Sequence, residues 1–503
     1  MPKELENRTL YFGDNLEILR EKIPDESIDL IYLDPPFNSN RNYNVIFKEG
    51  LVENSAQIHA FEDSWHWGRE TQKTFDYLVT KTNSEISDMM LAFEKMLGHN
   101  DVLAYLTMMA IRLIELHRVL KISGSIYLHC DPTASHYLKI VMDVIFGKEN
   151  FLNEIIWHYR RWPAKAMRFQ RMHDVILFYA KRSGKQIFNV DYEPLAESTL
   201  KADKGLKIKN IILPDGRRIR GEKSGEASLG VPQSDIFRIS MISPTSKERL
   251  GYPTQKPEAL LEKIIKASSN EGDLILDPFC GCGTTVSVAE RLNRKWIGID
   301  ITMLAINAIS SRLTKQFEGR GLKKKIIFGG LPKDMGGAKA LAKDKPFDFE
   351  YWALHLINAM PAKDKTQENM KGPDKGIDGI ITFHKDFSNK KHEFGKAIVQ
   401  VKGGKVQRNQ IATLKGDMER ERADAGIFIT LNEPTRQMKE EAYSVGDFKT
   451  GYGQKEYPKI QILTVEEIIN GKKPDLPPGS EKPYYKEAKE IEDNSNQKGL
   501  FGG

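Results

Sequence analysis

Short apolar runs alternate with helical patterns along the first 320 residues of the chain. Residues 28–33 are an apolar run that ends at Asp34, and Leu16, Leu19 and Ile23 before it follow helical spacing. Further strands are predicted over 9–12, 125–129, 154–159, 175–179, 274–276 and 296–299, and helices over 102–120, 137–146, 257–267 and 285–292. The alternation predicts an α/β domain whose helices cover both faces of a mostly parallel sheet.

Two segments interrupt this alternation of strand and helix patterns and divide the chain. Residues 183–245 gain Lys, Gly, Ser and Pro and lose periodicity, which is typical of a loop-rich recognition insert or of a disordered linker. Residues 321–345, rich in Lys and Gly, are predicted to link a domain over 1–320 to a smaller α/β domain over 346–470. The second domain is predicted from helices over 349–360 and 407–422 and strands over 376–383, 396–402 and 426–430. The tail, 471–503, is predicted to be disordered.

The composition is that of a globular protein with more than one core. A chain of 503 residues, 40% hydrophobic and 29% charged, is expected to form two or three domains. No apolar run is long enough to span a bilayer, and the first residues lack a signal-peptide pattern, so we expect a cytoplasmic protein without a membrane partner. The three cysteines, Cys130, Cys280 and Cys282, provide neither a disulfide framework nor a four-cysteine zinc site.

The formal net charge of +6 is too small to identify a partner by itself. Its distribution is more informative, because basic residues gather over 160–171 and 201–223. Aromatic residues interleave with the first group, at Trp157, Tyr159, Trp162 and Phe169. Such a surface could stack on nucleobases. The alternative interpretation is a solvated helix face beside an aromatic core stripe.

The run Asp34-Pro35-Pro36-Phe37 has the chemistry to act on an exocyclic amine of a base. The lone pair of such an amine is delocalised into the ring, and two hydrogen-bond acceptors draw the nitrogen toward tetrahedral geometry. The Asp34 carboxylate and the carbonyl of Pro35 can accept the two N–H groups. Pro36 stiffens the turn, and Phe37 can stack on the base. A base inside a duplex cannot reach this site, so the nucleotide would be flipped out. The alternative interpretation is a strand end followed by a proline turn.

A glycine-rich turn over 277–285 follows the strand at 274–276. Gly281 and Gly283 allow close approach of a ligand, and Asp300, after the next strand, can accept hydrogen bonds from ribose hydroxyls. Asp277 opens the turn with a negative charge, which disfavours pyrophosphate and favours a cationic ligand such as S-adenosyl-L-methionine. The alternative is a nucleotide-binding turn of another kind. Cys280 and Cys282 alternate in this turn and are expected to be packing residues.

These motifs resemble those of DNA amino-methyltransferases of the β arrangement, in which the catalytic block precedes the donor-binding block. The resemblance covers about residues 9–313, with further blocks at 13–15, 124–131, 146–151, 173–177 and 252–257. It implies a permuted Rossmann-like sheet, double-stranded DNA as substrate and S-adenosyl-L-methionine as cofactor, with a homodimer left open. The resemblance implies that the cofactor is bound by Asp14, Asn15, Thr254, Lys256, Pro257, Asp277, Phe279, Gly281, Gly283, Thr284, Thr285 and Asp300.

The same resemblance suggests what the enzyme recognises. Residues 183–245 would be the target recognition region. Asp34 together with Phe37 favours adenine N6 as the acceptor, because N4-cytosine enzymes more often carry serine in place of the aspartate. N4-cytosine transfer stays open as an alternative.

A second constellation lies in the C-terminal part of the chain. Gln400 and Lys402 are two residues apart on a predicted strand, so they share a face, and we expect Asp378 beside them. Asp378, Gln400 and Glu350 could hold Mg²⁺, while Lys402 steadies a water or phosphate. The segment resembles the Mrr-like variant of the restriction-endonuclease fold, in which glutamine replaces a glutamate. An inactive DNA-clamping module of the same fold is the alternative.

Together these features predict a restriction–modification protein that methylates adenine N6 and cleaves DNA. No Gly-x-x-x-x-Gly-Lys-Ser/Thr motif occurs in the sequence, so ATP-driven translocation within this chain is not supported. Two alternatives stay open: a methyltransferase with a non-cleaving DNA-binding module, and a regulatory DNA-binding protein with a vestigial donor site.

Overall fold

The computed structural model describes residues 5–36, 67–132, 134–161, 167–208, 211–219, 221, 223–250, 252, 254–322, 325–361, 376–386, 393–450 and 455–477. The elements before the insert are β1 (Thr9–Phe12), α1 (Asn15–Lys22), β2 (Ile28–Leu33), α3 (Arg69–Lys81), α4 (Ser84–Leu97), α5 (Asp101–Val119), β3 (Leu120–Cys130), α6 (Ser135–Phe146), β4 (Phe151–His158) and β5 (His173–Ala180). After the insert come α8 (Glu258–Ser268), β13 (Leu274–Asp277), α9 (Thr284–Arg291), β14 (Lys295–Asp300), α10 (Met303–Gln316) and β15 (Ile327–Gly329).

These strands, together with β12 (Ile236–Arg238), form one sheet of nine, in the order β12-β4-β5-β3-β2-β13-β14-β1-β15. Every neighbouring pair is parallel except those made by β5, which runs antiparallel to both β3 and β4. The first strands of the chain therefore lie beside strands from the far end of the domain: Ile31 of β2 is opposite Leu276, and Thr9 of β1 is opposite both Ile297 and Ile327. The predicted fold class, a permuted and mostly parallel Rossmann-like sheet, is confirmed.

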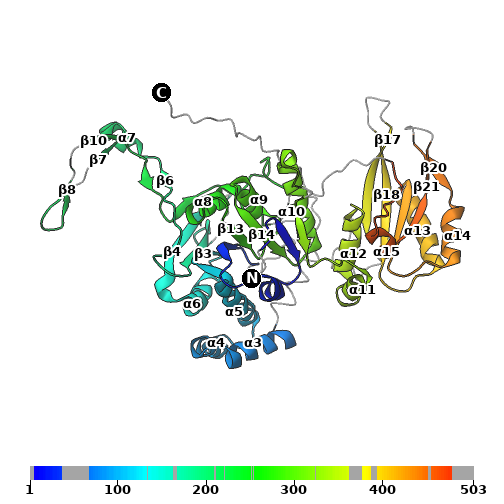
Figure 1. Ribbon diagram of the computed structural model, residues 1–503, viewed down its shortest axis with the longest axis horizontal. Coiled ribbons are helices and arrows are strands. Elements are labelled where there is room, and N and C mark those ends of the chain that lie inside the picture. The colour runs from blue at the N-terminus through cyan, green and yellow to red at the C-terminus, as the bar shows by residue number, and fades with distance from the viewer. Residues whose placement is uncertain are drawn as a thin grey trace.

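Alternating side chains bury both faces of the sheet. On β2, Leu30 and Tyr32 belong to an apolar cluster with α8, α9 and α10, whereas Ile31 and Leu33 belong to a cluster with α1 and α3–α6. All six residues of β2 are buried, as expected for a central strand covered by helices on both faces. Figure 1 shows these two helical layers around the central strands.

The insert forms an arm that projects from the large sheet (Figure 1). Its elements are β6 (Tyr192–Glu193), α7 (Glu197–Asp203), β7 (Leu206–Ile208), β8 (Ile211–Ile212), β9 (Arg218–Ile219), β10 (Lys223–Ala227) and β11 (Val231–Pro232). They pair as antiparallel ribbons, β6 with β11, β7 with β10 and β8 with β9. A last strand, β12 (Ile236–Arg238), returns to the large sheet and pairs with β4. The region predicted as loop-rich thus contains paired strands.

The segment predicted as a linker, 321–345, contains regular structure instead. β15 adds to the edge of the large sheet beside β1, and α11 (Met335–Asp344) follows, capped by the Asp334 side chain. The glycine that suggested a linker has a packing reason, because a Cβ at Gly329 would lie 2.2 Å from the ring of Tyr11. High lysine and glycine content therefore gave a misleading signal here.

The C-terminal part forms a second sheet, in the order β16-β17-β18-β19-β22. Its elements are α12 (Pro346–Leu356), β16 (Met360–Pro361), β17 (Gly379–Asp386), β18 (Glu393–Lys402), α13 (Arg408–Glu421), β19 (Ala425–Thr430), α14 (Arg436–Ser444), β20 (Asp447–Lys449), β21 (Glu456–Pro458), β22 (Ile460–Thr464) and α15 (Val465–Ile469). Val399 and Val401 pack on the side of α12, whereas Ile398 packs with α13 and α14. This is the smaller α/β domain that the sequence predicts. In the described part of the chain, no helix has the length and apolarity needed to cross a membrane.

Candidate active sites

The structure brings Asp34 and the glycine-rich turn over 277–285 to one edge of the large sheet. β2 and β13 are parallel neighbours, with Leu30 opposite Ile275 and Ile31 opposite Leu276. Asp34 follows β2 directly, and Asp277 ends β13, so both carboxylates emerge at the carboxyl ends of adjacent strands. This is the edge at which open α/β sheets bind ligands.

Asp34 is held by one partner and offers one free oxygen. Its Oδ2 accepts a hydrogen bond from the ammonium of Lys256, in an ion pair whose side chains are only 17% and 11% exposed. Its Oδ1 is buried and accepts no hydrogen bond from the part of the chain that the structure describes. Pro35 is buried and Pro36 half-buried after it. A buried carboxylate oxygen without a hydrogen-bond donor lowers the stability of the fold unless a ligand supplies the donor. Phe37 lies outside the described residues.

Lys256 was predicted to bind the cofactor, and the structure places its ammonium on Asp34. Thr254, just before it, is exposed and has a positive φ of 61°, while Pro257 is buried and precedes α8 as its cap. This segment therefore reaches across from α8 to the end of β2.

The glycine turn adopts a backbone that requires its glycines. Gly281 and Gly283 have φ of +52° and +75°, and a Cβ at Gly283 would lie 2.9 Å from Ile309. Two carboxylates fix the turn from inside: Asp277 Oδ1 accepts the N–H of Phe279 at 3.0 Å, and Asp300 Oδ2 accepts that of Gly281 at 2.9 Å. Thr284 and Thr285 begin α9 and are buried.

Both of these carboxyl groups are destabilised in the charged form. Burial raises the pKa of Asp277 to about 7, and the negative charges of Asp34 and Asp300 act in the same direction. Burial likewise raises the pKa of Asp300 to about 6. A concentration of buried carboxyl groups beside a permissive glycine turn favours a positively charged ligand.

Asp14 and Asn15 support this turn from the side. Asp14 caps α1 and forms an ion pair with Arg112, whose guanidinium also donates to Asn15 Oδ1 at 2.6 Å. Asn15 in turn donates to the carbonyl of Pro278 at 2.7 Å. Arg112 was missed in the sequence because it is one polar position on the long amphipathic helix α5, with no motif around it.

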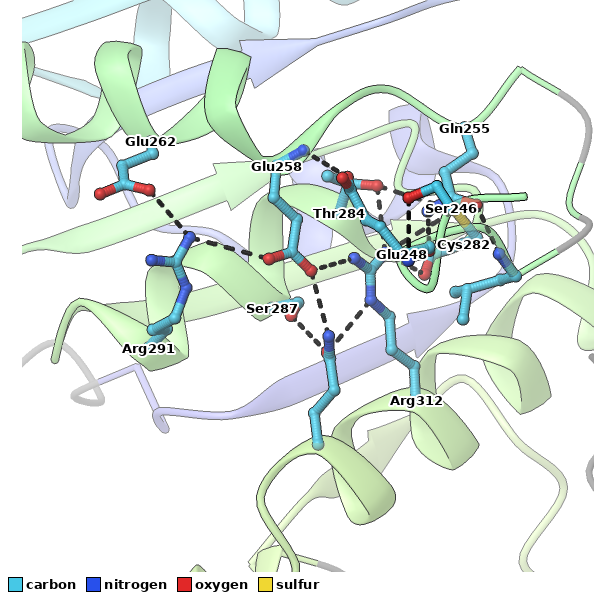
Figure 2. A network of polar contacts seen from close by, with 12 residues as sticks. Ser246, Glu248, Gln255, Glu258, Glu262, Cys282, Thr284, Ser287, Arg291 and Arg312 are labelled. Carbon is cyan, nitrogen blue, oxygen red and sulfur yellow. Dashed lines mark hydrogen bonds and ion pairs between the residues drawn. The ribbon is translucent and has the colours of Figure 1, made fainter. Parts of the chain in front are cut away.

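A buried arginine joins the turn to α8 and α10 (Figure 2). Arg312, on α10, donates to Thr284 Oγ1 at 3.1 Å and to Glu258 Oε1 at 2.6 Å. Glu248 Oε1 accepts the N–H of Glu258, and Gln255 donates to the carbonyl of Glu248. We call Arg312, Glu258, Glu248 and Gln255 the clamp, because they attach the segment that carries Lys256 to the glycine turn.

The C-terminal constellation is also partly assembled. The N–H of Asp378 bonds to the carbonyl of Val399, and its Oδ2 accepts the N–H of Val401, so Asp378 lies beside Gln400. Gln400 is buried, and its Nε2 donates to Asp417 Oδ2 at 2.8 Å. Asp417, a buried residue of α13 that was missed in the sequence, thus engages the amide nitrogen and leaves Oε1 of Gln400 for another partner.

Lys402 and Glu350 are the other two residues predicted for this site. Lys402 ends β18 and is half-buried. Glu350 lies on α12, whose buried residues Phe349 and Trp352 pack with Val399 on one face of the sheet. Gln400 and Ile398 are on the other face, so α12 and Gln400 lie on opposite sides of the sheet. Among the described residues, no group of three or more Asp, Glu, His or Cys side chains is arranged to hold a metal ion. The roles of Glu350 and of Mg²⁺ stay predictions.

Comparison with known proteins identifies both parts. A family model described as DNA methylase, of N6/N4 type, matches residues 28–311. The chain belongs to this N6/N4 DNA methylase family, and residues 341–454 match a second family, described as restriction endonuclease, of the Mrr type. The resemblances drawn from the sequence are therefore confirmed.

The relatives are consistent with this assignment. DNA adenine methyltransferase YhdJ of Escherichia coli K12 is 30% identical, over 59% of this chain and 79% of its own length. The type II methyltransferase M.HpaI of Haemophilus parainfluenzae is 28% identical, over 59% of this chain and 72% of its own length. M.BamHI of Bacillus amyloliquefaciens is 27% identical, over 73% of this chain and 68% of its own length.

Solved structures are more distant. The M1.HpyAVI complex with SAM is 17% identical, covers 61% of this chain and 98% of its own, and has a TM-score of 0.33. PvuII DNA methyltransferase, which is cytosine-N4-specific, is 18% identical, covers 61% of this chain and 86% of its own, and has a TM-score of 0.34. Scores this low do not distinguish adenine from cytosine as the acceptor.

Proposed function

We propose that the chain transfers a methyl group from S-adenosyl-L-methionine to the N6 amine of an adenine that is flipped out of duplex DNA. One observation carries this proposal: Oδ1 of Asp34, which is buried and has no hydrogen-bond partner among the described residues, stands at the end of the strand next to the glycine turn. An amine N–H is the donor that this oxygen lacks. The names of the relatives, one of them an adenine methyltransferase, support DNA and adenine.

The residues around the turn fit the cofactor. When bound, S-adenosyl-L-methionine supplies a methyl group on a cationic sulfur, which leaves as a neutral thioether. Asp277 and Asp300, whose pKa values burial raises, lie where positive charge and ribose hydroxyls would offset that burial. Among the described residues no side chain caps the start of α9, so its first N–H groups add further donors.

Asp34 acts on the acceptor amine. Oδ1 accepts one N–H, the carbonyl of Pro35 accepts the other, and the nitrogen lone pair is released toward the methyl carbon. The nitrogen forms its new bond to carbon as the bond from carbon to sulfur breaks, and it then loses a proton, which Oδ1 can accept. Lys256 holds the other oxygen, so the carboxylate is fixed before the base arrives.

Nucleoside analysis tests the acceptor directly. DNA treated with the protein and isotopically labelled S-adenosyl-L-methionine is digested and its nucleosides are separated by mass. We expect label in N6-methyladenine. Label in N4-methylcytosine would replace adenine as the acceptor while keeping the mechanism, and label in 5-methylcytosine would contradict it.

We further propose that the C-terminal domain cleaves DNA with Mg²⁺, the metal being held by oxygens of Asp378 and Gln400. The donor types suit a hard cation, and Asp417 orients the Gln400 amide so that its oxygen is available. Lys402→Ala should abolish Mg²⁺-dependent cleavage of unmethylated plasmid. Lys405→Ala, an exposed lysine three residues away, should cleave as the wild type does. Equal cleavage by the wild type and Lys402→Ala, or none by the wild type, would favour a DNA-clamping module.

A further inference from the structure

The loop between β4 and β5 leaves the sheet at the edge that carries Asp34. β5 is antiparallel to β3 and to β4, and β3 is parallel to β2, so the end of β4 and the start of β5 lie at the carboxyl end of β2. The described parts of this loop are residues 159–161 and 167–172. We call these parts the β4–β5 loop.

Side-chain hydrogen bonds connect this loop to the catalytic strand. Tyr32, two residues before Asp34, bonds through its hydroxyl to His129 Nδ1 at 2.9 Å, and His129 Nε2 lies 3.3 Å from Asp174 Oδ2. The hydroxyl of Tyr159 donates to Asp174 Oδ1 at 2.9 Å. His129 is fully buried and the Asp174 side chain is 17% exposed, so most of this connection is shielded from water.

The ionisation states favour this connection at neutral pH. Burial raises the pKa of Tyr159 to about 12, so its hydroxyl keeps the proton that it donates. Burial works against ionisation of Asp174, but the hydrogen bond from His129 lowers the pKa of its carboxyl, with Lys256 acting in the same direction. Residues at the start of the loop are thus fixed relative to Asp34.

Beyond this fixed base, the loop exposes large apolar side chains among cations. Phe169 and Met167 are 102% and 107% exposed, so neither has a packing partner in the described part of the chain. Arg160, Arg161, Arg168 and Arg171 of the same loop are exposed as well. Arg161 is stabilised over the ring of Tyr159, with its guanidinium carbon 5.0 Å from the ring centroid.

An apolar tip flanked by arginines is complementary to DNA. Arginine side chains bind backbone phosphates, and apolar wedges enter between base steps of duplexes that proteins distort. Flipping a nucleotide leaves a gap in the stack beside the flipped base, and the gap is apolar on its faces. A fully exposed phenylalanine near the acceptor site has the shape and chemistry to fill it.

We propose that Phe169 enters the duplex in place of the flipped nucleotide, while arginines of the β4–β5 loop hold the adjacent phosphates. This inference rests on the proposed methyl transfer to a flipped base, and it assigns the flipping to a residue outside both transfer motifs. Tyr159 and Asp174 act as positioning residues, since they support the loop and do not contact DNA.

Duplexes in which the target base is paired or unpaired test whether Phe169 enters the duplex. Both carry the sequence that the wild-type protein methylates, and in the second an abasic site replaces the partner of the target base. Single-turnover methylation by Phe169→Ala should be about tenfold slower than wild type on the paired duplex. On the duplex with the abasic site it should be within about twofold of wild type, because that target base is already unpaired. Phe169→Trp should restore most of the rate.

The control and the contrary outcomes are defined by the same assay. Tyr443→Ala removes a 90%-exposed aromatic of α14, in the other domain, and should match the wild type on both duplexes. Wild-type rates for Phe169→Ala on the paired duplex, or an equal loss on both duplexes, would overturn the wedge. Failure of the wild type to methylate any duplex DNA, so that no target sequence can be found, would overturn the proposed function and this inference with it.

Salt dependence tests the arginines separately. If Arg168 contacts a phosphate, Arg168→Gln should reduce the slope of log affinity against log salt by about 0.9. An unchanged slope for both Arg168→Gln and Arg171→Gln would contradict phosphate binding by this loop.

Discussion

We expect Asp277 to link the binding of the methyl donor to proton release. Burial raises the pKa of its carboxyl to about 7, well above the ordinary value of 3.8. Because the folded-state pKa lies above the unfolded-state value, ionising Asp277 costs stability as the pH rises from about 4 through 7. A cationic ligand reverses that cost by favouring the carboxylate, so the affinity for S-adenosyl-L-methionine should rise with pH across this range.

Calorimetry can count the released protons. At about pH 6.5, where much of Asp277 is neutral, binding of S-adenosyl-L-methionine should release up to about one proton. The measured heat should therefore differ between phosphate and imidazole buffers, which differ in ionisation enthalpy. Asp277→Asn should remove most of this difference. A heat that is independent of buffer in the wild type would contradict an Asp277 that ionises on binding.

The contact between Gln400 and Asp417 explains why this position has a neutral glutamine, although a glutamate would bind a metal ion more strongly. Its amide donates to the buried carboxylate of Asp417, so a glutamate here would place two buried carboxylates in contact. We expect Gln400→Glu to lower the free energy of unfolding by about 2–4 kcal/mol. Adding Asp417→Asn should recover most of the loss, as measured by urea denaturation. Independent, additive effects of the two changes would contradict the coupling.

At the scale of elements, the clamp should decide whether the segment around Lys256 stays in place. Arg312 is buried and joins α10 to Glu258 of α8 and to Thr284 of α9. Arg312→Met should reduce stability by about 3 kcal/mol, because it removes a buried ion pair and leaves the Glu258 carboxylate with Gln316 at 3.0 Å and Arg291 at 3.7 Å. It should also weaken the binding of S-adenosyl-L-methionine.

The exposed pair of Arg436 and Glu440 provides the comparison for the clamp. Arg436→Ala should change stability by less than about 1 kcal/mol. Thermal unfolding monitors the stability, and calorimetric titration monitors the binding. Equal effects of the two arginine substitutions would show that the clamp contributes no more than a surface ion pair.

Elements that show a clear pattern in their own residues could be predicted from the sequence. β2, β13 and β14 are apolar runs that end in a carboxylate, and the structure has them as 28–33, 274–277 and 295–300. Elements whose signal is non-local could not: β15 adds only three residues to a sheet edge, and its Gly329 is explained by Tyr11, more than 300 residues earlier.

The same distinction applies to site residues. Asp34, Asp277 and the two glycines belong to compact motifs, so their types and spacing indicate chemistry. Arg112, Arg312 and Asp417 act through side chains that the fold alone brings together, and no motif surrounds them. Lys256 was found as part of a block, but its contact with Asp34 spans 222 residues and could not be foreseen.

At the scale of the whole molecule, strand order explains how one chain unites distant motifs. The parallel pairing of β2 with β13 places Asp34 beside Asp277, although the strands belong to opposite ends of the first domain. The second sheet belongs to a part of the chain, residues 341–454, that matches the restriction-endonuclease family model. Modification and cleavage would then act on DNA held by one protein.

The central claim is that a base amine, held by Asp34, receives a methyl group from a donor bound at the glycine turn. Single-turnover transfer from labelled S-adenosyl-L-methionine to duplex DNA by Asp34→Asn tests it most directly. We expect a rate at least about 100-fold below wild type, with donor affinity within about threefold because the turn is intact. Transfer by Asp34→Asn at the wild-type rate would contradict it.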